Sequence, residues 1–120
     1  MSTSLAICRG YLGKEIKIKI DRPIGSVHPR FDEIKYTSNC GYLEGVKAPD
    51  GDDLDAYLLN VGEPVSDYQG VVVAIVHRIS DDDDKLVVVP KGQSISDEEI
   101  EKQVEFQEKW SKSGHVIIRK

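Results

Sequence analysis

The sequence is poor in the features that mark membrane-spanning and secreted proteins. Its longest apolar run covers only residues 71–76, far short of the roughly 20 residues that a membrane-spanning helix needs. The first residues, Met1 to Ile7, hold no basic residue and no long apolar segment, so we expect no secretory signal peptide. The sequence therefore predicts a cytoplasmic protein with no membrane partner.

Cysteine and histidine are also scarce. Two cysteines, Cys8 and Cys40, and three histidines are spread along the chain without a CxxC pair. This excludes a disulfide-rich scaffold and gives no thiolate–imidazole metal site. We expect two free thiols. A nucleophilic role for Cys40 stays open, although no histidine lies near it in the sequence.

Positive charge is the third scarcity. The chain has 16 basic and 21 acidic residues, a net charge of −5, which argues against a strongly basic nucleic-acid-binding protein. Eight of the acidic residues lie in two short segments, 50–55 and 81–84, so the rest of the chain is slightly basic. Clustered carboxylates repel one another unless cations neutralise them. The two segments are either solvated turns or cation sites.

Short apolar segments predict a small β protein. Ile16, Ile18 and Ile20 alternate with charged residues, as in a strand with one buried face. Residues 70–77 are apolar enough for burial on both faces, and an acidic turn would pair them with 85–90 as a hairpin. We expect strands at 15–21, 55–60, 70–77, 85–90 and 115–119, with 36–46 irregular and then extended.

One amphipathic helix is predicted between the last two strands. Ser96 as N-cap with Glu99 three residues later forms a capping box, and Gly114 ends the segment. The apolar side is assigned to residues 100, 104, 106 and 110, and Glu108 is assigned to the solvent side. The 120 residues form one domain, 1–120, and the pattern predicts a small barrel closed by a helix.

The first acidic segment predicts a site for a hard cation. Residues 50–61 do not match a calcium loop, because position 6 is Asp55 and position 12 is Val61 where Gly and Glu are required. Asp50, Asp52 and Asp55 offer only carboxylate oxygens, which suit Mg²⁺ or Mn²⁺. Mg²⁺ commonly shares its ligands with substrate phosphates, so the pattern favours phosphoryl chemistry. Lys85 is either an ion-pair partner or a phosphate ligand.

The same segments resemble the soluble family I inorganic pyrophosphatases. Residues 50–56, D-G-D-D-L-D-A, match the family's signature except at Asp53. Residues 36–42, Y-T-S-N-C-G-Y, are similar to its Y-P-x-N-Y-G-Y segment at the family's spacing. Residues 21–26 are similar to its E-x-P-x-G-S segment, and 81–90 to its acidic loop followed by K-[LIV]-V-x-V-P.

The resemblance implies a mainly β (α+β) fold, a five-stranded oligonucleotide-binding-type barrel with helices. It implies Mg²⁺-dependent hydrolysis of inorganic pyrophosphate to two phosphates by a metal-activated water. The implied partner is this small molecule and not a nucleic acid. A homo-oligomer is also open, since the family usually forms one.

Roles for individual residues follow from the resemblance alone. Asp52 would take a proton from the attacking water, Lys85 would bind phosphate, and Tyr36 would supply a hydroxyl. The implied metal ligands are Asp50, Asp55, Asp81, Asp83 and Asp21.

Three departures lie on the phosphate side. The family's Lys-x-Glu is replaced by His28-Pro29-Arg30, and Arg30 is the first candidate for the missing cation, with His28 second. Cys40 replaces a tyrosine, and Trp110-Ser111 replaces Tyr-Lys. Two alternatives therefore stay open: hydrolysis of another small diphosphate or phosphate ester, and a non-catalytic paralogue that binds metal or phosphate.

Overall fold

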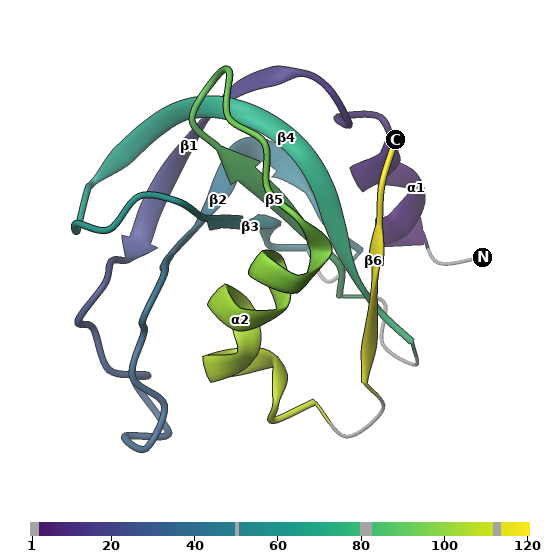
Figure 1. The fold of residues 1–120 in the computed structure, drawn as a ribbon. Helices are drawn as coiled ribbons and strands as arrows, with labels where there is room; N and C mark the ends of the chain where they lie inside the picture. Colours follow the sequence, from purple (N-terminus) through teal and green to yellow (C-terminus); the bar gives the residue numbers. More distant parts are fainter. Residues whose placement is uncertain (1–2, 50, 80–82, 112–113) are drawn as a thin grey trace.

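A closed β-barrel forms the body of the molecule (Figure 1). The structure is a computed structural model that describes residues 3–49, 51–79, 83–111 and 114–120. The elements in chain order are α1 (Thr3–Arg9), β1 (Glu15–Arg22), β2 (Asn39–Lys47), β3 (Asp53–Leu58), β4 (Asp67–Arg78), β5 (Lys85–Val89), α2 (Asp97–Glu108) and β6 (His115–Ile118). Within the described residues, five strands close the ring in the order β1-β2-β3-β5-β4, and β4 pairs back to β1. The predicted five-stranded barrel is confirmed.

The length of β4 explains how the barrel closes and still holds an extra strand. Its first residues pair with β1, from Asp67 opposite Lys19 to Val71 opposite Glu15. Its last residues pair with β6, which runs antiparallel to it along the sheet edge. The predicted hairpin of β4 with β5 is present and antiparallel. In contrast, β3 and β5 are parallel neighbours, and this pairing positions the site described below.

Alternation along the strands divides the apolar residues into two cores. In β3, Leu54, Ala56 and Leu58 point into the barrel, where they pack with Ile18 and other interior residues. The intervening Tyr57 points to the opposite face, where α2 covers the sheet. Because side chains alternate with a period of two, every second residue of β3 and β5 lies on the side of α2.

Helix α2 begins where the sequence predicts. The Ser96 hydroxyl accepts a hydrogen bond from the Glu99 amide at 3.1 Å, which satisfies one of the free amides of the first turn. Ile100 and Val104 are fully buried against the sheet. The prediction for Glu108 is wrong: this residue is only 2% exposed and points toward the sheet. The prediction that Trp110 lies on the apolar side is also wrong, since it is 51% exposed.

Helix α1 was not predicted. Its Ser4 hydroxyl donates to the buried Asp84 carboxylate at 2.7 Å and accepts from the Asp84 amide. Cys8 from the same helix packs into the barrel core. Among the described residues, neither helix is long and apolar enough to cross a membrane. Helix α1 therefore fixes one end of the second acidic segment to the barrel.

Candidate active site

A polar cavity of about 410 Å³ lies on the α2 side of the barrel wall. It is bounded by β1, β2, β3, β5, the connection between β1 and β2, and the end of α2. Three of its lining residues are aspartates, and two, Arg22 and Lys85, are basic. The lining residues are Asp21, Arg22, His28, Tyr36, Cys40, Gly41, Asp52, Asp55, Ala56, Lys85 and Gln107.

The parallel pairing of β3 and β5 brings an acid and a base together in this cavity. Ala56 pairs with Leu86, so Asp55 and Lys85 are neighbours on the face that lies opposite the barrel core. The Lys85 Nζ donates to Asp55 Oδ2 at 3.0 Å. Partial burial raises the pKa of the Asp55 carboxyl, Lys85 lowers it, and the nearby Asp83 and Asp21 raise it again. The pKa of Asp55 is raised overall, mainly because burial disfavours the charged carboxylate.

Asp52 enters the cavity from a tight turn at the start of β3. The Ala48 amide donates to the Asp52 carbonyl at 2.8 Å, and the Gly51 amide donates to the Ala48 carbonyl. Gly51 has a φ of 93°, a left-handed conformation that glycine adopts without strain. Asp53, in contrast, does not line the cavity and pairs with Lys47 at 2.7 Å. Neighbouring aspartates thus have different environments.

A network of charged side chains lies next to Lys85. The Arg78 guanidinium contacts Asp83 at 3.1 Å and Glu108 at 3.1 and 3.2 Å. The Tyr57 hydroxyl donates to Glu108 at 2.5 Å, and Lys85 lies 3.7 Å from Asp83. Burial lowers the pKa of Lys85, but Asp55 and Asp83 outweigh this effect and raise it. The lysine is therefore held charged inside the protein.

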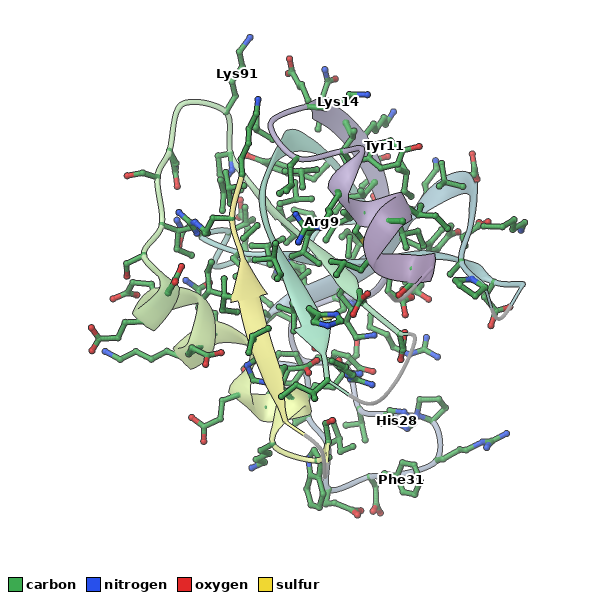
Figure 2. All side chains as sticks on the ribbon, turned by 90° about the vertical axis from the view of Figure 1, so that its right-hand side faces the viewer. Arg9, Tyr11, Lys14, His28, Phe31 and Lys91 are labelled. Carbon is green, nitrogen blue, oxygen red and sulfur yellow. The ribbon has the colours of Figure 1, made fainter. Side chains whose placement is uncertain are left out.

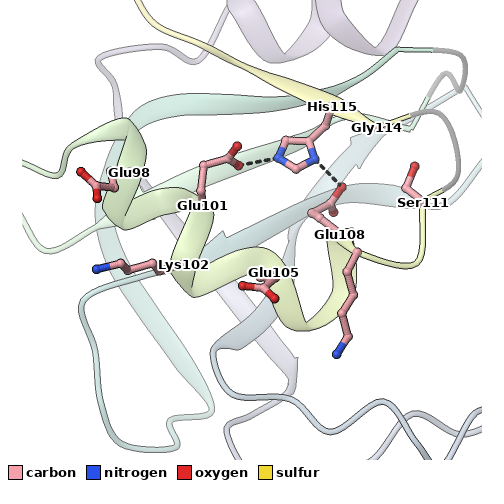
Figure 3. Close-up of a pocket in the computed structure, with 9 residues that line it drawn as sticks. Glu98, Glu101, Lys102, Glu105, Glu108, Ser111, Gly114 and His115 are labelled. Carbon is pink, nitrogen blue, oxygen red and sulfur yellow. Dashed lines mark hydrogen bonds and ion pairs between the residues drawn. The ribbon is translucent and has the colours of Figure 1, made fainter.

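A second cavity of about 520 Å³ lies between α2 and β6 and meets the same network (Figure 3). His115 points between two glutamates there, with Nε2 2.5 Å from Glu101 and Nδ1 3.9 Å from Glu108. Glu108 is already bound by Arg78 and Tyr57. Glu108 therefore belongs both to this cavity and to the charge network beside Lys85.

The wall of the first cavity contains Tyr36 and Cys40, which are almost fully buried. Burial raises the pKa of the Tyr36 hydroxyl, with a further increase from Cys40. Burial also raises the pKa of the Cys40 thiol. A protonated tyrosine hydroxyl can donate a hydrogen bond to an anion, whereas a protonated thiol is a poor nucleophile. The wall therefore favours anion binding over thiol chemistry.

The carboxylates of the cavity are of the type that binds a hard divalent cation, but those that the structure describes do not form a complete metal site. Among the described residues, no group of three or more His, Cys, Asp or Glu side chains is arranged to hold a metal ion. The predicted ligands Asp50 and Asp81 lie outside the described residues. Asp21, Asp52 and Asp55 supply carboxylate oxygens to the cavity, the ligand type that Mg²⁺ prefers.

Solved structures of inorganic pyrophosphatases share this architecture. The structure from Neisseria gonorrhoeae matches with a TM-score of 0.67 and 18% identity, covering 89% of this chain and 83% of that chain. The Helicobacter pylori structure matches with a TM-score of 0.59 and 16% identity, covering 88% of this chain and 82% of that chain. The Ehrlichia chaffeensis structure gives 0.53 and 21% identity, with 66% of this chain and 62% of that chain covered.

The chain has the inorganic pyrophosphatase fold. No protein-family model and no curated protein matches the sequence. The match to the pyrophosphatase structures therefore rests on the shape of the backbone, and at these identities it establishes the fold alone.

Within this pyrophosphatase fold, most of the predicted site residues that the structure describes come together. Those that line the cavity are Asp21, Tyr36, Asp52, Asp55 and Lys85. Asp83 contacts Lys85 from outside the lining. Arg30 is exposed and is not a lining residue.

Three further residues, Arg22, His28 and Gln107, also line the cavity. His28 was the second candidate for the missing cation, whereas Arg22 was given no role from the sequence. Gln107 gave no signal, because only the docking of the end of α2 brings it to the cavity.

Proposed function

We propose that this protein hydrolyses inorganic pyrophosphate to two phosphates with Mg²⁺ as cofactor. The observation that carries the proposal is one cavity in which Asp21, Asp52 and Asp55 face Lys85 and Tyr36, in a chain with the inorganic pyrophosphatase fold. Carboxylates for a cation beside donors for an anion suit a magnesium-bound diphosphate.

The proposed metal ligands are the carboxylates of the two acidic segments and of β1. Asp55 and Asp21 would hold Mg²⁺ from the cavity wall, with Asp50, Asp81 and Asp83 completing the set. When bound, the metal supplies positive charge that acidifies an attacking water and offsets the charge of the phosphoryl oxygens. Mn²⁺ has the same ligand preference and is expected to substitute.

The protein's own residues would move the proton and hold the anion. Asp52 accepts a proton from the water whose oxygen forms the new bond to phosphorus, while the bond from that phosphorus to the bridging oxygen breaks. Lys85 offsets charge on the departing phosphate, and the Tyr36 hydroxyl donates to a phosphate oxygen. No covalent enzyme intermediate forms. The roles of Arg30, a homo-oligomer and a cytoplasmic location stay predictions.

The experiment is phosphate release from Mg²⁺-pyrophosphate by the purified protein, compared with Asp52→Asn. The matched control is Asp53→Asn, because Asp53 is the adjacent carboxylate and pairs with Lys47 instead of lining the cavity. We expect activity that Asp52→Asn removes and Asp53→Asn retains. Equal phosphate release by the parent protein and Asp52→Asn, with Mg²⁺ or Mn²⁺, would exclude the proposal.

The altered phosphate side supports a second candidate, a hydrolase for another small diphosphate or phosphate ester. Cys40 lines the cavity where the resemblance implies a tyrosine, and Trp110, at the position of the implied second tyrosine, is half exposed. Competing diphosphates and phosphate esters should be assayed at equal concentration. A kcat/KM for one of them above that for pyrophosphate would favour the second candidate.

A further inference from the structure

The connection between β1 and β2 forms a hairpin beside the cavity. Val27 and Lys35 form a bridge across it, and the Tyr36 amide donates to the Ser26 carbonyl at 2.9 Å. The His28 amide donates to the Ile34 carbonyl at 2.9 Å. Figure 2 shows His28 and Phe31 together at the tip of this connection, away from the helix α1 end of the molecule. The hairpin is thus fixed by backbone hydrogen bonds at its base.

The His28 ring is held in one orientation by its own loop. Its Nδ1 accepts the amide hydrogen of Arg30 at 3.1 Å and that of Phe31 at 3.3 Å. The ring also packs against the Phe31 ring, with centroids 5.1 Å apart and planes tilted by 40°. Two hydrogen bonds and one ring contact leave the imidazole little freedom to rotate.

These contacts assign the tautomer. A nitrogen that accepts two amide hydrogens carries none itself, so the hydrogen of the ring lies on Nε2. Within the described part of the chain, Nε2 has no protein acceptor, and His28 is one of the residues that line the cavity. A lining residue therefore carries an oriented N–H donor that has no partner among the described residues.

We infer that His28, and not Arg30, supplies the hairpin's contact to the substrate, by donating its Nε2 hydrogen to a phosphate oxygen. The inference rests on the proposed function, since it names a ligand of that same anion. Arg30 contributes its backbone amide to orient the ring, while its side chain is exposed outside the lining. A fixed donor thus stands in the place of the cation that the resemblance implies.

The chemistry of this donor complements the rest of the wall. Lys85 is already paired with Asp55 and lies near Asp83, so part of its charge is used within the protein. A donor fixed by its own loop loses little conformational freedom when an anion binds. We therefore expect His28 to contribute orientation of the diphosphate in addition to affinity.

Two substitutions separate the donor role of Nε2 from the structural role of Nδ1, which accepts the loop amides. In His28→Asn the side-chain oxygen stands as far along the chain from Cβ as Nδ1 does, so it can accept the loop amides while the Nε2 donor is lost. In His28→Gln the terminal amide nitrogen stands where Nε2 did, so a donor remains while the loop acceptor is lost. Thermal unfolding of both variants shows whether either has lost its fold.

The experiment measures pyrophosphate binding by calorimetry, with Mg²⁺ present and with Asp52→Asn as the common background that blocks turnover. We expect His28→Asn to weaken binding about ten- to a hundredfold, the size of a hydrogen bond to a charged group. We expect His28→Gln to lose less affinity for pyrophosphate than His28→Asn. Arg30→Ala is also expected to lose less affinity than His28→Asn. The inference is overturned when His28→Asn binds as tightly as its background, or when Arg30→Ala causes the larger loss.

A second measurement separates failure of this inference from failure of the proposed function. Nitrogen NMR of the imidazole in the unsubstituted protein is expected to show the Nε2-protonated tautomer and a shift of Nε2 when pyrophosphate is added. An Nδ1-protonated ring, or no shift on binding, overturns the inference even when pyrophosphate is hydrolysed. If the Nε2 signal shifts and His28→Asn binds pyrophosphate more weakly, but pyrophosphate is not hydrolysed, the inference stands and the proposed reaction is excluded. A protein that does not bind pyrophosphate overturns both.

Discussion

Lys85 and Asp55 lie on neighbouring parallel strands, and the Lys85 Nζ is 3.0 Å from Asp55 Oδ2. The lysine side chain is 8% exposed, whereas that of Asp55 is 47% exposed. The cation is therefore buried in the wall while its partner carboxylate opens onto the cavity. A charge held in this way is preorganised for a substrate anion and needs no rearrangement on binding.

Removal of this charge tests its role. We expect Lys85→Met to lower kcat/KM for pyrophosphate by about 100-fold or more, the usual loss of one preorganised electrostatic group. The control is Lys91→Met, because Lys91 is an exposed lysine that contacts Glu15 outside the cavity. Comparable kinetics for the parent protein and Lys85→Met would show that the lysine only neutralises Asp55.

The close approach of β1 and β2 beside the cavity depends on Gly41. A Cβ at this position would lie 1.7 Å from the Lys19 carbonyl oxygen, whereas one at Gly62 would meet nothing within 4 Å. We expect Gly41→Ala to lower the free energy of unfolding by about 3 kcal/mol, since the two strands must separate. Gly62→Ala is expected to change it by less than about 0.5 kcal/mol. Urea denaturation measures both, and equal stability of the two variants would contradict the tight packing.

Glu108 makes the stability of the fold depend on pH in the acid range. Burial raises the pKa of its carboxyl, but hydrogen bonds from Arg78 and Tyr57 outweigh this effect and place the pKa below the ordinary 4.5. Its contribution to stability is therefore complete above pH 4.5 and is lost as the pH falls through the lower pKa of the folded state. We expect the unfolding free energy of Glu108→Gln to fall less steeply than that of the parent protein below pH 4.5. If the unfolding free energies of the two proteins fall equally steeply with pH, the role of Glu108 in the acid response is contradicted.

Both cysteines are expected to be unreactive in the folded protein. Burial raises the pKa of Cys8 to about 12 and also raises that of Cys40, so almost no thiolate is present at pH 8. Mass spectrometry after treatment with iodoacetamide should show no modification in the native protein and modification of both thiols in denaturant. Rapid alkylation of native Cys40 would reopen the nucleophilic role that the sequence left open.

The strands could be predicted because their signals are local. Ile18 and Ile20 of the alternating segment are buried in the barrel, and the Ser96 cap forms the expected hydrogen bond. Asp52 and Asp55 reach one cavity because they flank the same turn and strand start. In these cases a short stretch of sequence contains all the information that the structure uses.

The remaining features depend on contacts between distant segments. Nothing near Lys85 in the sequence indicates that β5 runs parallel to β3, yet this pairing alone joins it to Asp55. Glu108 has the pattern of a solvent-side residue, but Arg78 and Tyr57 supply buried partners that outweigh the cost of burial. His28 is oriented by amides of its own loop, a geometry that residue type does not reveal.

The central claim is tested most directly by phosphorus NMR of Mg²⁺-pyrophosphate incubated with the protein in oxygen-18 water. We predict conversion to phosphate with one labelled oxygen for each pyrophosphate cleaved, because the oxygen of the attacking water becomes part of one of the two phosphates. The conversion should be absent with Asp52→Asn and present with Asp53→Asn. An unchanged pyrophosphate signal, or conversion that persists in Asp52→Asn, would contradict the account.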